Sequence, residues 1–311
     1  MKTSQAGLKV HRREFLQTLA TVTAGVGNSS HGFGEVRPAE ADTVRDRLWM
    51  FGSPINADYE YVHQRSVMTA VEANFYFGVP NITMVQYYPR SPDLPIRAWE
   101  PPFEQYALPL KLLKRVEWSV VGGSGITKGW ETHQVLAMAR RTPNFVGIYM
   151  DDFFRDKGEG ERKLATFTPD ELRALQQRLK GPDKKLDLNV TLYANQLDRP
   201  IADHLAVIDK VTLWTWNSAD LANLDKNLST LERLAPKARK VLGCYMVEYD
   251  EGESIPIPAM QQQCEQGLKW LRDGRIESIM FIGNTVMDLN YEAVEWTRQW
   301  IQKVGETRLQ L

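Results

Sequence analysis

From Arg45 to its end, the chain alternates between apolar segments of strand length and amphipathic segments of helix length. The segments with a strand pattern cover residues 48–52, 81–88, 116–121, 144–150, 186–192, 210–217, 240–247 and 278–284. The segments with a helix pattern cover residues 57–77, 103–114, 128–141, 168–180, 200–208, 218–234, 258–272 and 290–303. Strict alternation with short connections predicts a parallel sheet, and about 250 residues in eight repeats are typical of a (β/α)8 barrel. We therefore predict an α/β fold, a single (β/α)8 TIM barrel over residues 45–311.

The main competing fold is an open, doubly wound sheet, which usually carries a glycine-rich phosphate loop after its first strand. Here the first strand pattern ends in Gly52-Ser53-Pro54, which does not match that loop. No P-loop motif occurs elsewhere in the chain. The closed barrel is therefore the better prediction.

The first 40 residues are predicted to be a targeting segment and a flexible N-terminus. Arg12-Arg13, one spacer and Phe15-Leu16 resemble the twin-arginine export signal, and the apolar run over residues 18–26 is shorter than the roughly 20 residues that span a bilayer. The resemblance implies that the twin-arginine export machinery is a partner and that the protein is exported folded. We therefore expect it in the periplasm or secreted, with no stable membrane span.

The overall composition excludes some partners. The net charge is -1 and no basic run occurs, which argues against nucleic acid. Of the two cysteines, Cys244 falls on a strand pattern and Cys264 on the following helix pattern. We expect two buried apolar thiols rather than a disulfide. The 9 Trp and 11 Tyr residues are more than ordinary packing calls for and suggest flat platforms for a ligand.

The segment 144–154 contains the most informative strand pattern. An apolar run ends in Asp151-Asp152, and a charge at the end of a buried strand has a cost unless it is used or paired. In (β/α)8 barrels, catalytic groups lie at these C-terminal strand ends. Asp151 shares its face of the strand with Gly147 and Tyr149, so we expect its side chain to point into the barrel.

The other strand ends carry aromatic, amide and carboxylate side chains. On this basis we predict a substrate-binding set that comprises Tyr88, Tyr193, Asn195, Trp214, Trp216, Tyr245 and Asn284. The last strand but one is followed by Glu248 and Asp250. No strand end carries Lys, Arg or His. This absence helps to choose among the enzyme reactions that the barrel could catalyse.

Several enzyme classes are excluded by these absences. A Schiff-base aldolase needs a lysine at a strand end, and a serine hydrolase needs a histidine partner for Ser53. The histidines lie in the N-terminal segment, in a loop or on helix patterns, at positions 11, 31, 63, 133 and 204. A His-rich metal site is therefore not expected, and we predict no metal and no cofactor.

Glycoside hydrolysis needs only two carboxylates and aromatic walls, and these the chain has. At this point the sequence resembles exported (β/α)8 glycoside hydrolases, through Gly-Ile-Tyr-Met-Asp-Asp-Phe at strand four and Tyr-Met-Val-Glu-Tyr-Asp at strand seven. The large retaining clan on this fold has Asn-Glu at strand four, where this chain has Asp151-Asp152. The resemblance implies cleavage of a carbohydrate ligand by Asp151 or Asp152 together with Glu248.

Other interpretations of the same residues remain open. Asp152 could cap the loop beyond its strand, and Glu248 and Asp250 could belong to a solvated acidic loop. Trp214 and Trp216 could pack in the core or form a sugar platform. At the level of function, the alternatives are a non-catalytic carbohydrate-binding barrel and a lyase or isomerase that uses the three acids around a divalent cation.

Overall fold

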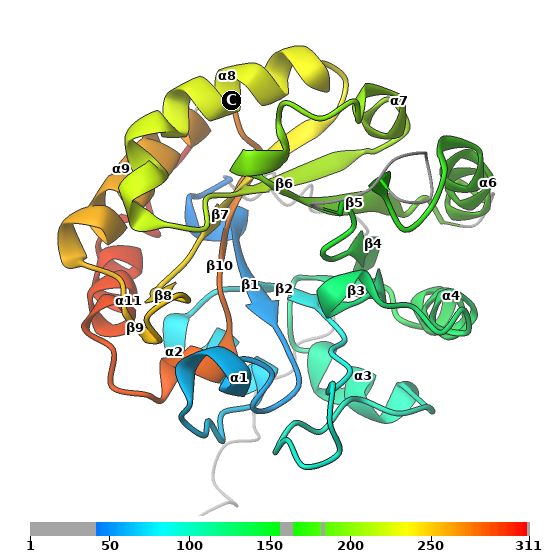
Figure 1. The fold of residues 1–311 in the computed structure, drawn as a ribbon, viewed down its shortest axis with the longest axis horizontal. Helices are drawn as coiled ribbons and strands as arrows, with labels where there is room; N and C mark the ends of the chain where they lie inside the picture. Colours follow the sequence, from blue (N-terminus) through cyan, green and yellow to red (C-terminus); the bar gives the residue numbers. More distant parts are fainter. Residues whose placement is uncertain (1–41, 156–163, 182–183, 310–311) are drawn as a thin grey trace, which may run out of the picture. The chain divides into compact units, whose positions relative to one another are not determined.

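The computed structural model describes residues 42–155, 164–181 and 184–309, which form a closed barrel of eight parallel strands surrounded by helices (Figure 1). The strands of the barrel are β1 (Leu48–Gly52), β2 (Asn81–Met84), β3 (Arg115–Val121), β4 (Phe145–Met150), β5 (Asp187–Tyr193), β6 (Lys210–Trp214), β7 (Arg239–Cys244) and β10 (Ser278–Phe281). Each strand pairs with its neighbour in the chain, and β10 pairs with β1 to close the ring. The predicted (β/α)8 fold is confirmed.

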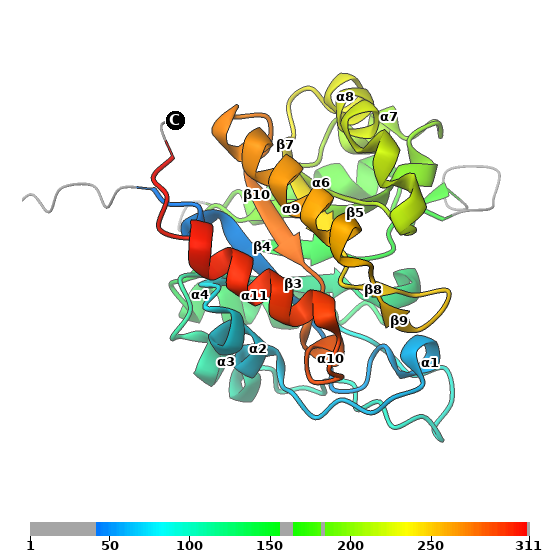
Figure 2. The ribbon, with the colours of Figure 1, turned by 90° about the vertical axis from the view of Figure 1, so that its left-hand side faces the viewer.

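The helices pack outside the barrel, and α9 and α11 lie side by side in Figure 2. The helices are α1 (Tyr59–Val62), α2 (Ala70–Phe77), α3 (Glu104–Leu110), α4 (Glu131–Arg141), α6 (Pro169–Leu179), α7 (Ala202–Leu205), α8 (Leu224–Leu234), α9 (Ile257–Arg272), α10 (Asn284–Met287) and α11 (Glu292–Val304). None of the helices in the described part of the chain is long and apolar enough to cross a membrane. The twin-arginine motif lies outside the described residues.

The expected helix over residues 57–77 is instead two helices with an extended segment between them. α1 ends at His63, whose φ of 52° places it in the left-handed region that terminates helices. α2 begins at a capping box in which the hydroxyl of Thr69 accepts from the Glu72 amide and the Glu72 carboxylate accepts from the Thr69 amide. Residues 53–58, which precede α1, form a loop.

The seventh strand of the barrel is shorter than the strand predicted from the apolar pattern over residues 240–247. β7 ends at Cys244, and the chain then forms a two-stranded hairpin of β8 (Val247–Glu248) and β9 (Glu253–Ser254). Apolar periodicity alone cannot separate these two elements, because Tyr245 to Val247 remain buried beyond the barrel strand.

A buried ion pair crosses the barrel interior near the N-terminal ends of the strands. The Nζ atom of Lys210, the first residue of β6, lies 2.5 Å from Oε1 of Glu117 on β3. Both residues are less than 5% exposed. Thr83 and Asn189 donate to Oε2 of the same carboxylate, at 3.2 and 3.0 Å. Strands β3 and β6 are separated by β4 and β5, so this network connects opposite sides of the barrel.

The pKa of Lys210 is raised by this environment. Burial alone would lower it, but the carboxylates of Glu117, Glu277 and Asp187 outweigh the loss of water. Lys210 Nζ also lies 5.1 Å from the ring centroid of Trp49. The interior at this end therefore holds a hydrogen-bonded cluster of ionisable side chains.

We predict that Lys210→Met and Glu117→Gln each lower the free energy of unfolding by about 3–5 kcal/mol, because each leaves a buried charge without its partner. The double variant Glu117→Leu with Lys210→Met should lose much less than the sum, since neither charge then remains. Urea unfolding measures all three. The exposed pair of Asp170 and Arg173 on α6 is the matched control, and its removal should cost below about 1 kcal/mol. Single variants as stable as the wild type would contradict this account.

Candidate active site

A small cavity of about 80 Å³ lies at the C-terminal ends of the strands, where a (β/α)8 barrel places its chemistry. Six of the residues predicted from the sequence line it, namely Asp151, Asp152, Tyr193, Trp214, Trp216 and Tyr245. Side chains that the sequence did not single out complete it, among them Phe51, Asp58, Tyr61, Tyr87, Ser124 and Tyr249. The cavity therefore combines carboxyl groups with a wall of aromatic rings.

Asp151 follows the last residue of β4 and is 7% exposed. Its Oδ1 accepts a hydrogen bond of 2.7 Å from the hydroxyl of Thr191 on β5, and that hydroxyl also bonds Tyr149 at 2.8 Å. Burial and then the charge of Asp152 raise the pKa of Asp151 well above its usual value, which outweighs the hydrogen bond from Thr191. The environment thus favours the protonated carboxylic acid, the form that a general acid needs.

Asp152 both lines the cavity and anchors the surrounding loops. Its Oδ1 accepts from the hydroxyl of Tyr193 at 2.5 Å, and its Oδ2 accepts from the backbone amide of Ser124 at 2.6 Å. Its φ of 43° is left-handed, a conformation that an aspartate tolerates better than most residues. Asp152 therefore ties the loop that follows β3 to the end of β5.

The aromatic wall is built around Trp216, which is only partly buried. Its indole lies 4.9 Å from the ring of Tyr249 at an interplanar angle of 24°, and its N–H donates to Asp250 at 3.2 Å. Tyr61 and Tyr245 meet the same indole edge-on, with centroids at 6.2 and 5.7 Å. This contact set fixes the orientation of an aromatic face at the cavity rim.

Trp214, by contrast, is 1% exposed and packs in the barrel core. It lies against Gly243 of β7, where an added Cβ would come within 2.2 Å of the indole. Although it borders the cavity, it exposes almost no surface. Of the two tryptophans on this strand, Trp216 is therefore the one placed as a platform.

Four of the predicted site residues are not among the described residues that line the cavity. Glu248 is in the β8–β9 hairpin and accepts from the Ser218 amide at 3.4 Å. Asn195 is exposed on a 3-10 turn (Ala194–Gln196). Tyr88 donates to Glu131 at 2.7 Å. Asn284 is fully buried, and its amide bonds Ser53 and Met68 instead of a ligand.

Each of these four residues follows a strand closely in the sequence, and that proximity alone does not bring a side chain to the cavity. The expected pairing of Glu248 with Asp151 or Asp152 depended on strand seven continuing to Val247, and that strand ends earlier. The geometry gives no support to that pairing.

The carboxylate that sequence analysis missed is Asp58, in the loop between β1 and α1. Its Oδ1 accepts from the Tyr249 hydroxyl at 3.2 Å and its Oδ2 accepts from the Thr285 hydroxyl. Burial raises the pKa of Asp58 despite these two hydrogen bonds. Asp58 fell at the start of an apparent helix from 57 to 77, where an acid is ordinary. In the structure it is the residue before α1, at the end of the loop that follows β1.

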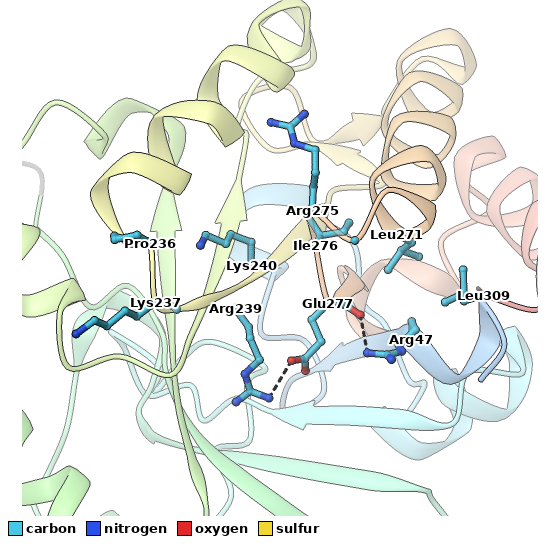
Figure 3. A pocket seen from close by; sticks show the side chains of 12 residues that line it. Arg47, Pro236, Lys237, Arg239, Lys240, Leu271, Arg275, Ile276, Glu277 and Leu309 are labelled. Carbon is cyan, nitrogen blue, oxygen red and sulfur yellow. Dashed lines mark hydrogen bonds and ion pairs between the residues drawn. The ribbon is translucent and has the colours of Figure 1, made fainter. Parts of the chain in front are cut away.

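A second cavity, of about 380 Å³, lies at the opposite end of the barrel, where β7 and β10 begin (Figure 3). It is rich in cations, and several of them are paired within the protein. Arg239 bonds Glu277 at 2.8 Å, Arg275 bonds Glu232 at 2.9 Å, and Lys240 donates to the Ala235 carbonyl at 2.8 Å. These contacts explain the cations as structural, so the cavity at the mouth is the candidate active site.

Within residues 42–155, 164–181 and 184–309, no group of three or more His, Cys, Asp or Glu side chains is arranged to hold a metal ion.

The raised pKa of Asp151 predicts a pH-dependent cost to folding. An ordinary aspartate in the unfolded chain titrates near pH 3.9. Because the folded pKa is higher, the unfolded state loses its proton first, and stability falls as pH rises from the unfolded to the folded pKa. Asp151→Asn cannot ionise, so its free energy of unfolding relative to that of the wild type should increase as pH rises above about 4, up to the folded pKa of Asp151.

Urea unfolding across that pH range measures the difference. Asp170→Asn, an exposed carboxylate on α6, is the control and should differ from the wild type by less than about 0.5 kcal/mol throughout. An Asp151→Asn variant that is less stable than the wild type by the same amount at every pH would show that Asp151 is not destabilised by its charge.

Known structures are similar to this chain in their barrel fold, at low sequence identity. No protein-family model and no curated protein sequence matches the chain. The glycoside hydrolase domain of PgaB (BpsB) from Bordetella bronchiseptica is similar over 81% of this chain and 98% of its own, with 12% identity and a TM-score of 0.50. The family 18 chitinase from Cycas revoluta, in structures with (GlcNAc)4 and with allosamidin, gives the same identity, coverage and TM-score. This chain therefore has the (β/α)8 barrel fold that these glycoside hydrolases share.

Proposed function

We propose that this protein is a carbohydrate-active enzyme that hydrolyses a glycosidic bond in the cavity at the barrel mouth, with Asp151 as the proton donor. The observation that carries the proposal is the buried Asp151 carboxyl at the end of β4, which lines a cavity walled by aromatic side chains and whose pKa is raised by burial. A general acid must be protonated at the working pH to protonate the leaving oxygen, and burial provides that state.

The cavity walls support a saccharide as the ligand. Trp216, Tyr61 and Tyr249 offer flat rings that suit the apolar face of a pyranose, and the phenol and carboxyl groups can bind hydroxyls. Because the cavity encloses only about 80 Å³, most of a longer saccharide would lie outside it, against the rim.

The charge of the cavity also narrows the ligand class. Among the described lining residues, none is Lys, Arg or His. Arg90 donates to the Ser124 hydroxyl at 3.3 Å, so one cation lies close to the lining residues. Asp58, Asp151 and Asp152 outnumber it, so neutral saccharides are favoured over phosphorylated or otherwise anionic sugars.

We predict that the wild type cleaves at least one member of a panel of aryl glycosides and oligosaccharides. The panel should begin with GlcNAc-containing compounds, since the similar chitinase is known with (GlcNAc)4. Asp151→Asn should lower kcat by roughly a hundredfold or more while the protein stays folded, because the leaving oxygen loses its proton source. In the wild type, kcat should fall as pH rises through the folded pKa of Asp151.

Asp170→Asn is again the matched control and should leave kcat unchanged. If the wild type binds saccharides in calorimetry but cleaves none of them, the protein is instead a non-catalytic carbohydrate-binding barrel. Dependence of turnover on an added divalent cation would favour the lyase or isomerase alternative.

We also propose that the protein reaches the periplasm or the exterior in folded form, through the twin-arginine route. The support is Arg12-Arg13 followed by Phe15-Leu16 and a short apolar run. A fusion of residues 1–45 to a folded reporter should be exported only in cells that have the twin-arginine machinery. Replacing both arginines with lysine should abolish export, and export that survives this change would refute the assignment.

A further inference from the structure

We infer that Asp58 is the general base that works opposite Asp151 on the same scissile bond, an inference that rests on the proposed function. Hydrolysis by two carboxyl groups requires one on each side of the glycosidic carbon. Glu248, the partner expected from the sequence, lies in a hairpin outside the cavity. The second carboxylate must therefore come from another part of the fold.

Asp58 meets the positional requirement. It follows β1 in the chain, and β1 is separated from β4 by β2 and β3 in the closed barrel. In an eight-stranded barrel, strands three places apart face one another across the mouth. Asp58 and Asp151 line the same cavity, so a sugar bound there has a carboxyl group on either side.

Asp152 does not meet that requirement. It directly follows Asp151 at the end of the same strand, so the two approach a ligand from one side of the mouth. Both of its oxygens also hold loops in place, through Tyr193 and the Ser124 amide. Its geometry suits a residue that positions Tyr193. Its charge also helps to raise the pKa of Asp151.

The partners of Asp58 leave it able to accept a proton. Each carboxylate oxygen has one neutral hydroxyl donor, Tyr249 or Thr285, and a second lone pair that can face water. Asp58 forms no ion pair with any described residue within 4 Å that would hold its charge. The titratable groups that face it are the phenols of Tyr61, Tyr249 and Tyr291 and the Asp151 carboxyl.

The proposed step is a single displacement with inversion. A water oxygen bonds to the anomeric carbon while one of its protons passes to Asp58. The glycosidic carbon–oxygen bond breaks, and the leaving oxygen takes the proton of Asp151. Afterwards Asp58 is protonated and Asp151 is ionised, and exchange of one proton with solvent at each site restores the enzyme. A raised pKa strengthens Asp58 as a base for this step.

The test uses the full chain and the aryl glycoside that the wild type cleaves fastest. We expect Asp58→Asn to lower kcat at least a hundredfold. In its pH profile, the fall in kcat at high pH, which belongs to Asp151, should remain. The fall at low pH, which belongs to Asp58, should disappear. In Asp58→Ala, added sodium azide should restore turnover and give a glycosyl azide of inverted configuration, because azide needs no base. Asp203→Asn, an exposed carboxylate on α7, is the control and should behave as the wild type.

Product configuration, read by NMR, gives the final check, and the wild type should release the inverted sugar. Three results would overturn the inference: retention of configuration, an Asp58→Asn kcat within tenfold of the wild type, or a loss of turnover without azide rescue and with the acidic limb intact in a folded variant. A wild type that cleaves no glycoside overturns the proposed function itself, whereas an active wild type with an active Asp58→Asn overturns only the role of Asp58.

Discussion

The ion pair between Glu117 and Lys210 is the contact on which the interior of this barrel depends. It joins β3 to β6 across the barrel, and the hydroxyl of Thr83 and the amide of Asn189 complete the coordination of the carboxylate. A buried pair of this kind contributes little net stability compared with an apolar filling, but each charge is costly without the other. The pair therefore demands that β2, β3, β5 and β6 stand in one register, and it specifies the closed barrel more than it strengthens it.

Above this pair the barrel is filled by aromatic rings. Phe51 meets Tyr149 and Trp214 edge-on, at centroid distances of 6.1 and 5.7 Å. Trp214 in turn fills the space that Gly243 leaves on β7. This layer leaves no room for Asp151 to descend into the barrel, so its carboxyl lies at the mouth, where it bonds Thr191.

The pKa values of carboxyl groups are shifted in opposite directions at the two ends of the barrel. At the N-terminal end, burial would raise the pKa of Asp187, but Lys210 and Arg239 lower it below the usual value. At the mouth, Asp151 and Asp58 have hydroxyl partners in Thr191, Tyr249 and Thr285, and burial raises both pKa values. Nearby cations thus favour the charged form of the carboxyl group at one end, and burial favours its neutral form at the other.

Much of this protein follows from its sequence because the responsible signals are local. The period of the apolar pattern gave the eight strands, the run of apolar residues before Asp151 gave its place at a strand end, and Thr168 with Glu171 marked the start of α6. Asp151, Asp152, Tyr193 and Trp216 could be selected for the same reason, since each lies within two residues of a strand end.

Only the tertiary structure decided which of these groups meet. Glu248 was expected at a strand end and Asp58 on a helix, yet Glu248 lies in a hairpin away from the cavity and Asp58 lines the cavity from the loop after β1. The pKa directions of Asp151 and Asp58 depend on burial and on hydroxyls from distant strands and loops. Local propensity contains no information on such contacts, because they arise only when the barrel closes.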